Sequence, residues 1–95
     1  MPAFVLVDME IHDEPGYAPY RPLVADLIRE HQGKLTHRIS DFESVEGDWC
    51  PTRMVIIEFP DRTHAKAFVD DPAYVPVKRI RLDTATSKFV IGESE

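Results

Sequence analysis

The sequence predicts an α+β fold: one four-stranded antiparallel sheet with both helical regions packed on the same face. Three observations support this prediction. Apolar residues alternate at every second position near the start, the middle and the end of the chain, which is typical of strands with one buried face. Two intervening segments instead carry apolar residues at helical spacing. At 95 residues, the chain is expected to form one domain over residues 1–95.

The first strand is expected over residues 3–12. One face is uniformly apolar, and the other grades from Phe4 and Leu6 to charged residues. The breaker sequence Asp-Glu-Pro-Gly ends the strand, with Asp13 as a helix N-cap and Pro15 in the first turn. The apolar face comprises Ala3, Val5, Val7, Met9 and Ile11, and the mixed face comprises Phe4, Leu6, Asp8, Glu10 and His12.

The first helix is predicted within residues 17–31, followed by Gly33 as its C-cap. Pro19 and Pro22 indicate an irregular first turn, because proline is tolerated only where no intrahelical donor is required. The regular helix is therefore expected to begin near Pro19. The residues at helical spacing are Tyr17, Tyr20, Val24, Leu27, Ile28 and His31, with Leu23 beside them.

Two further strands are predicted over residues 34–45 and 53–60, joined by a turn at 46–48 into an antiparallel hairpin. In the first of them, strict alternation places Leu35 with His37 and Ile39, opposite Thr36, Arg38 and Ser40, and a bulge or bend is expected at residues 40–41. In the second, one side comprises Val55, Ile57 and Phe59, and the other comprises Met54, Ile56 and Glu58.

The second helical region begins after Asp61, which is a suitable N-cap, and Ala65, Phe68 and Val69 form its inner stripe. The Asp-Asp-Pro sequence at 70–72 interrupts it, and a helical period resumes with Tyr74, Val77 and Ile80 despite Pro76. A last strand is expected over residues 87–93, with Phe89 and Ile91 on one side. The order strand, helix, strand, strand, helix, strand is that of a ferredoxin-like fold.

In this fold, one face of the sheet has no helix to cover it. It would carry Phe4, Leu6, Asp8, Met54, Ile56 and Glu58. A surface this apolar is expected to be an interface. We therefore expect a homodimer formed through this face.

The composition excludes several classes of function. A net charge of −6 argues against non-specific nucleic-acid binding, and Lys78, Arg79 and Arg81 are interpreted as an ordinary solvated face. The single cysteine, Cys50, cannot form an internal disulfide and fits a reducing cytoplasm. No secretory signal and no membrane-spanning run is recognised, so we expect a cytoplasmic protein without membrane contact. The histidines His12, His31, His37 and His64 lack metal-ligand spacing, so neither a metal nor a cofactor is expected.

Several segments together resemble one family. These are residues 1–8, the Tyr-Ala-Pro-Tyr-Arg helix start at 17–21, Glu-Gly-Asp-Trp at 46–49, residues 55–61, Pro-Ala-Tyr at 72–74 and Ser-Lys-Phe-Val at 87–90. The set is similar to the small bacterial proteins grouped as domain of unknown function 1330, a branch of the dimeric α+β barrel superfamily. The resemblance implies a ferredoxin-like protomer, a homodimer whose sheets face each other and no settled biochemical function. Pro22 and Pro76 depart from the pattern, which leaves the helix boundaries open.

The most specific chemical candidate is a group formed by Asp8, Arg38 and Glu58. The alternation places Asp8 and Glu58 on the same face of strands that we expect to be neighbours at the centre of the sheet, with Arg38 reaching them from the hairpin partner. Two such carboxylates could act as acid and base, with Arg38 anchoring an anionic substrate. His12, at a strand end, is a further candidate base. The alternative is an ion-pair network that fixes strand register or dimer geometry.

Aromatic side chains suggest a second candidate feature. Tyr17, Tyr20 and Trp49 could form the walls of a ligand pocket, or could be ordinary packing aromatics. The resemblance adds that the wider superfamily includes cofactor-independent monooxygenases and lactone isomerases acting on aromatic or cyclic substrates. The leading hypothesis is thus a homodimer that binds a small cyclic, phenolic or acidic molecule in a cleft between sheet and helices, with proton-transfer, monooxygenase-like or isomerase-like activity left open. The alternative is a non-catalytic ligand-sensing or structural dimer.

Overall fold

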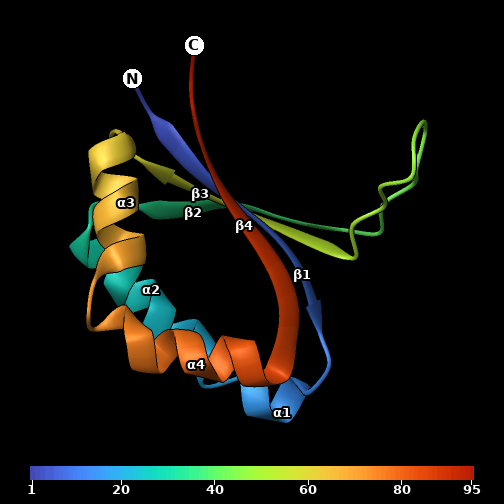
Figure 1. Cartoon of the computed structure of the whole chain (residues 1–95), viewed down its shortest axis with the longest axis horizontal. Helices are drawn as coiled ribbons and strands as arrows, with labels where there is room; N and C mark the ends of the chain where they lie inside the picture. Colours follow the sequence, from blue (N-terminus) through green and yellow to red (C-terminus); the bar gives the residue numbers. More distant parts are fainter.

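The computed structural model describes all residues, 1–95, as one sheet with helices on a single face (Figure 1). The strands are ordered β2-β3-β1-β4, and every neighbouring pair is antiparallel. The predicted ferredoxin-like fold is therefore confirmed. In chain order the elements are β1 (Ala3–Ile11), α1 (Glu14–Tyr17), α2 (Tyr20–Glu30), β2 (Lys34–Ser40), β3 (Arg53–Phe59), α3 (Arg62–Asp70), α4 (Tyr74–Thr84) and β4 (Ala85–Glu93).

The core lies between the sheet and the helices. β1 contributes Val5 and Val7 to it, in register with Ile57 and Val55 of the neighbouring strand. An aromatic stack connects the two layers, with ring centroids 5.5 Å apart between Phe59 and Phe68, and 5.0 Å apart between Phe68 and Tyr74. The apolar faces predicted for these strands thus pack against the helices. The fully or nearly fully buried apolar residues are Ala3, Val5, Val7, Met9, Tyr17, Tyr20, Leu27, Ile28, Ile57, Phe59, Ala65, Phe68, Tyr74, Val77 and Ala85.

The opposite face of the sheet carries no helix (Figure 1). Phe4 and Leu6 of β1 lie there, in register with Glu58 and Ile56 of β3, and all four side chains are only partly buried. Val90 of β4, which is opposite Leu6, is 57% exposed. The predicted uncovered face is therefore present in the protomer.

Pro22 and Pro76 lie at positions where a proline costs a helix little stability. Pro22 and Pro76 are each the third residue of their helices, α2 and α4. The first four N–H groups of a helix have no intrahelical acceptor, so a proline there removes no hydrogen bond.

Asp61 caps α3 as predicted, its Oδ1 accepting a hydrogen bond from the His64 backbone N–H at 2.8 Å.

The end of α2 differs from the prediction. Gln32, not Gly33, adopts the left-handed conformation that ends the helix, with φ of 64°. The Gly33 N–H donates to the Ile28 carbonyl at 2.8 Å. Gly33 is required for space instead, because a Cβ there would lie 2.5 Å from the Phe59 ring. The glycine therefore permits close packing rather than an unusual backbone angle.

β2 is shorter and less regular than expected. It ends at Ser40, five residues before the predicted boundary, and Asp41 follows with φ of 61°. Residues 41–52 form a long connection that extends away from the body of the molecule (Figure 1). The register of β2 against β3 also shifts within the strand: Leu35 pairs with Ile57, while His37 pairs with the adjacent Ile56.

This bulge lies at Leu35–His37 rather than at residues 40–41, and it changes which face Arg38 occupies. Thr36 is the extra residue, so the alternation restarts after it. Arg38 pairs with Val55 and shares the helix-covered face with Leu35, whereas His37 and Ile39 face outward. The expectation that Arg38 lies opposite Leu35 is therefore wrong.

The second half of the chain shows two further differences. α4 continues to Thr84, and β4 begins at Ala85, two residues earlier than predicted. Arg81, expected on a solvated face, is only 5% exposed because it lies on the buried stripe of α4 with Tyr74, Val77 and Thr84. The helices are too short or too polar to cross a bilayer.

Candidate ligand pocket

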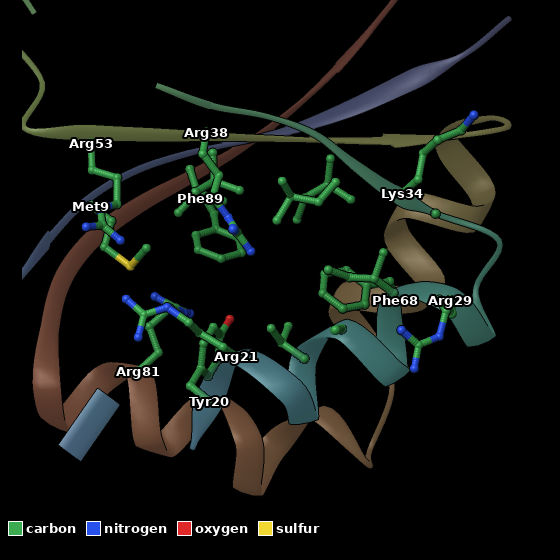
Figure 2. A pocket seen from close by; sticks show the side chains of 18 of the residues that line it. Met9, Tyr20, Arg21, Arg29, Lys34, Arg38, Arg53, Phe68, Arg81 and Phe89 are labelled. Atoms are coloured by element: carbon green, nitrogen blue, oxygen red, sulfur yellow. The ribbon is translucent and has the colours of Figure 1, made fainter. Parts of the chain in front are cut away.

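A cavity of about 290 Å³ lies between α2 and the sheet (Figure 2). Residues from both layers line it, including Val7 of β1, Phe89 of β4 and Tyr20 of α2. Apolar side chains form most of its surface. Its lining comprises Val7, Met9, Tyr17, Tyr20, Arg21, Val24, Ala25, Ile28, Arg29, Gly33, Lys34, Leu35, Arg38, Arg53, Val55, Ile57, Phe68, Arg81 and Phe89.

Two tyrosines form part of the helical wall. The ring centroids of Tyr17 and Tyr20 lie 5.1 Å apart. The Tyr20 hydroxyl is hydrogen-bonded to the Tyr74 hydroxyl at 2.7 Å. Burial raises the pKa of Tyr17 above 10.0, against the opposing effect of Arg21, Arg53 and Arg81. Burial and then the neighbouring Tyr74 raise the pKa of Tyr20 as well. Both phenols therefore stay neutral at physiological pH.

Every charged residue in the lining is a cation. Six of the eleven lysines and arginines of this chain line the cavity, although the net charge of the chain is −6. No aspartate or glutamate lines it. The cations are Arg21, Arg29, Lys34, Arg38, Arg53 and Arg81.

Their orientations divide them into two groups (Figure 2). Arg38 and Arg53 reach into the cavity from the sheet, and Arg21 and Arg81 reach into it from the helices. The end groups of Arg29 and Lys34 point away from its centre. The positive charge is therefore concentrated at the end of the cavity near Phe89.

Some of these cations are neutralised locally. Arg21 forms an ion pair with Glu14 at 2.6 Å, and Arg29 forms one with Asp26. Arg38, Arg53 and Arg81 form no ion pair with any carboxylate of the chain. We refer to these three residues as the arginine cluster.

Arg81 is the most buried member of this cluster. Its guanidinium carbon lies 4.2 Å from the centroid of the Phe89 ring, and its Nη1 donates to the Ser87 hydroxyl. Its Nε is buried and has no hydrogen-bond partner. The side chain is thus held in place by neutral groups while its charge has no counter-ion.

The structure brings together only some of the residues predicted to form a site. Tyr17, Tyr20 and Arg38 line the cavity. Asp8 and Glu58 lie on the other face of the sheet, and they are not neighbours, since Asp8 pairs with Met54 while Glu58 pairs with Phe4. That register separates them by about 13 Å along the strand. The predicted group of Asp8, Arg38 and Glu58 is therefore not assembled in the protomer.

The remaining candidates also lie outside the cavity. The Trp49 indole N–H donates to Asp8 Oδ2 at 2.9 Å, so this tryptophan covers part of the outer face and is not a pocket wall. His12 Nε2 is hydrogen-bonded to the Thr86 hydroxyl at 2.7 Å at the end of β1. No cluster of three or more histidine, cysteine, aspartate or glutamate side chains is placed to hold a metal ion.

Sequence reasoning missed Arg21, Arg53 and Arg81 as pocket residues. Their positions did carry a signal. Arg21 is four residues after Tyr17, Arg53 alternates with Val55, and Arg81 is four residues after Val77. Each cation therefore continues an apolar stripe, which distinguishes it from a cation on a solvated face.

The chain belongs to the family described as Domain of unknown function (DUF1330), whose model matches residues 2–94. The family predicted from the sequence is thus confirmed. No curated protein matches the sequence.

Solved structures support the same fold. The chain is similar to a protein of unknown function from Rhodopseudomonas palustris, with 17% identity and a TM-score of 0.79 over 99% of this chain and 82% of that one. SnoaB, a cofactor-independent oxygenase from Streptomyces nogalater, shows 14% identity and a TM-score of 0.67 over 99% and 92%. A dimeric ferredoxin-like protein of unknown function from Jannaschia sp. shows 14% identity and a TM-score of 0.69 over 99% and 100%.

Proposed function

We propose that the protein binds a small organic molecule with a cyclic or phenolic body in the cavity between α2 and the sheet. The observation that carries this proposal is the cavity itself, a partly open space of about 290 Å³ between the sheet and the helices of a domain of 95 residues. Protein interiors are normally packed with few voids larger than a water molecule. A space this large, lined mainly by apolar and aromatic side chains, is typical of a ligand site.

The dimensions restrict the ligand. Pockets for small molecules typically measure about 300–1,000 Å³, so this one is at the small end of that range. The Tyr20 and Phe68 rings contribute aromatic surface to the lining, against which a planar ring can pack. A small cyclic compound fits this combination better than a nucleotide or a lipid does.

The enzymatic form of the proposal is oxygenation of the bound compound by molecular oxygen without a cofactor. The fold that the chain shares with SnoaB supports this reaction class. The cavity lining contains no histidine and no carboxylate, so Asp8, Glu58 and His12 are poorly placed to transfer protons there. Oxygen consumption, measured with an electrode in the presence of candidate phenols, tests this form. A rate no higher than that without protein, from compounds shown to bind, would leave a binding function only.

Thermal-shift screening tests the binding proposal itself. A ligand that binds only the folded state raises the melting temperature, by mass action. The panel comprises small ring acids, phenols and their uncharged derivatives, and the control is a variant in which Ala25 is replaced by tryptophan to fill the cavity. We expect several compounds to stabilise the wild type and none to stabilise Ala25→Trp. A uniform absence of shifts with both proteins would contradict the proposal.

A second candidate is a non-catalytic homodimer whose charged residues only secure the interface. The uncovered outer face favours it, since Leu6, Ile56 and Val90 share a surface that no helix covers. The description of the Jannaschia protein as dimeric supports the same assembly. Dimerisation through the outer face is compatible with ligand binding, because the cavity and the outer face lie on opposite sides of the sheet.

A further inference from the structure

The most unusual feature of the cavity is that its charge is uncompensated. An ionised side chain taken out of water costs several kcal/mol unless a partner of opposite charge is present. Arginine does not avoid this cost by losing its proton. Arg81 is 5% exposed, its Nε has no hydrogen-bond partner, and it forms no ion pair with a carboxylate.

No carboxylate of the chain forms an ion pair with any member of the arginine cluster. Arg38 and Arg53, which reach toward the same space, are also cations without carboxylate partners. The hydroxyl groups of Tyr17 and Tyr20 are neutral and can only donate or accept hydrogen bonds. An anionic ligand would supply the counter-charge that these ion pairs do not.

We propose that the arginine cluster is a subsite for the carboxylate of a ring-bearing organic acid. The inference rests on the proposed binding function and names the class of ligand. Arg81 at the buried end holds the carboxylate, and Arg53 and Arg38 flank it. The ring of the acid occupies the apolar part of the cavity toward Phe68.

The chemistry of the arginine side chains suits a carboxylate. A guanidinium presents its N–H donors in a planar fork that matches the two oxygens of a carboxylate. Phe89 and Ser87 hold the Arg81 guanidinium in one orientation, which lowers the entropy lost when a ligand binds.

The three arginines of the cluster also differ in how deeply they are buried. Arg38 is exposed, Arg53 is half-buried and Arg81 is buried. A negatively charged ligand would thus meet successive positive charges as it enters, although the whole protein is acidic. A local field of this kind attracts anions into a cleft.

Calorimetric titration with matched acids and amides tests the subsite. The probes are benzoate, salicylate and phenylacetate, with benzamide, salicylamide and phenylacetamide as uncharged counterparts of the same shape. The proteins are the wild type, Arg38→Met, Arg53→Met, Arg81→Met and Arg81→Lys. The control is Arg62→Met, which removes one positive charge outside the cavity, where Arg62 pairs with Glu93.

We expect wild type and Arg62→Met to bind at least one acid about tenfold or more tightly than its amide, since hydrogen bonds to charged groups are the stronger ones. Arg81→Met should abolish that preference, and Arg38→Met and Arg53→Met should reduce it. Arg81→Lys should restore part of it. If Arg81→Met fails to fold, the other two methionine variants and Arg81→Lys still decide the question.

The possible failures are distinguishable. Amides that bind as tightly as acids, unaffected by the arginine variants, would overturn the carboxylate subsite but leave the proposed binding function intact. An equal loss of acid binding in Arg62→Met would show a general effect of net charge and would also overturn the subsite. If neither acids nor amides bind, the binding function and the subsite fall together.

Discussion

At the scale of single residues, a hydrogen bond to Tyr74 fixes the cavity-lining Tyr20 in place. Their hydroxyl groups form a buried hydrogen bond of 2.7 Å that connects α2 with α4. Tyr74 is 2% exposed, so its hydroxyl has no access to water as an alternative partner. Removing one hydroxyl therefore leaves the other buried and unsatisfied.

This pair gives a prediction about stability. Tyr20→Phe should lower the free energy of unfolding by about 1–3 kcal/mol, the usual cost of a buried polar group without a partner. The double variant Tyr20→Phe/Tyr74→Phe should lose much less than the sum of the two single variants. Urea denaturation of all four proteins measures the cycle. Strictly additive losses would show that the two hydroxyls do not depend on each other.

The acidic residues before α4 lead to a prediction about pH. Asp71 accepts a hydrogen bond from His31 at 2.8 Å, and this bond, followed by the Ala73 backbone N–H, lowers the pKa of Asp71 below 3.8. A carboxylate whose pKa is lower in the folded state stabilises the protein above its unfolded pKa, and this contribution is lost as the pH falls through the folded pKa.

Asp71→Asn should therefore melt at a lower temperature than wild type near neutral pH, and the difference should shrink as the pH falls below 3.8. Melting curves across the acidic range, followed by circular dichroism, test this dependence. Asp70→Asn is the matched control, because the neighbouring Asp70 forms no ion pair. A difference that stays constant with pH would contradict a role for the Asp71 charge.

At the scale of elements, the junction between α2 and β2 is closely packed against the core. Gly33 lies directly against the Phe59 ring, and a Cβ there would approach it to 2.5 Å. Gly92 of β4 has open space around it, with nothing within 4 Å of a Cβ at that position. Gly92 therefore serves as the control for a substitution at Gly33.

Gly33→Ala should destabilise the protein by about 1–3 kcal/mol, the usual cost of overpacking a core. Gly92→Ala should be neutral or slightly stabilising, because alanine restricts the unfolded chain more than glycine does. Chemical denaturation of the two variants provides the comparison. Equal stability of both variants would mean that the Phe59 ring moves aside without cost.

β2 also shows what the sequence could predict and what it could not. Alternation correctly placed Val5, Ile57 and Phe59 against the helices, because those strands are regular and one face of each is buried. It failed for Arg38, because one extra residue, Thr36, inverts the alternation and leaves no mark in the pattern of residue types. Arg81 was missed for a different reason: a charge was assumed to face solvent, although its position on the stripe of Tyr74 and Val77 indicated burial.

The pairing register between strands was the second feature that the sequence could not predict. Asp8 and Glu58 were correctly placed on one face, but only the register of β1 against β3 determines whether they are neighbours. That register depends on contacts between strands 50 residues apart in sequence, which alternation within each strand does not specify. The cavity could not be predicted either, because it depends on how α2 sits over the sheet.

For the whole molecule, the uncovered face of the sheet predicts self-association. Leu6→Glu and Ile56→Glu place charges at the centre of this face and should convert a dimer to a monomer, measured by light scattering or sedimentation. Val75→Glu is the control, since Val75 is 68% exposed on α4, away from the sheet. A wild type that is monomeric at all concentrations would contradict a dimer, without affecting the cavity.

The location of the carboxylate in a crystal of the complex tests the central claim most directly. Crystals grown with the tightest-binding ring acid should show its carboxylate within hydrogen-bond distance of the Arg81 guanidinium, with Arg53 and Arg38 beside it and the ring in the apolar part of the cavity. An acid bound only at the outer face, or one seated in the cavity with its carboxylate directed away from Arg81, would contradict that claim.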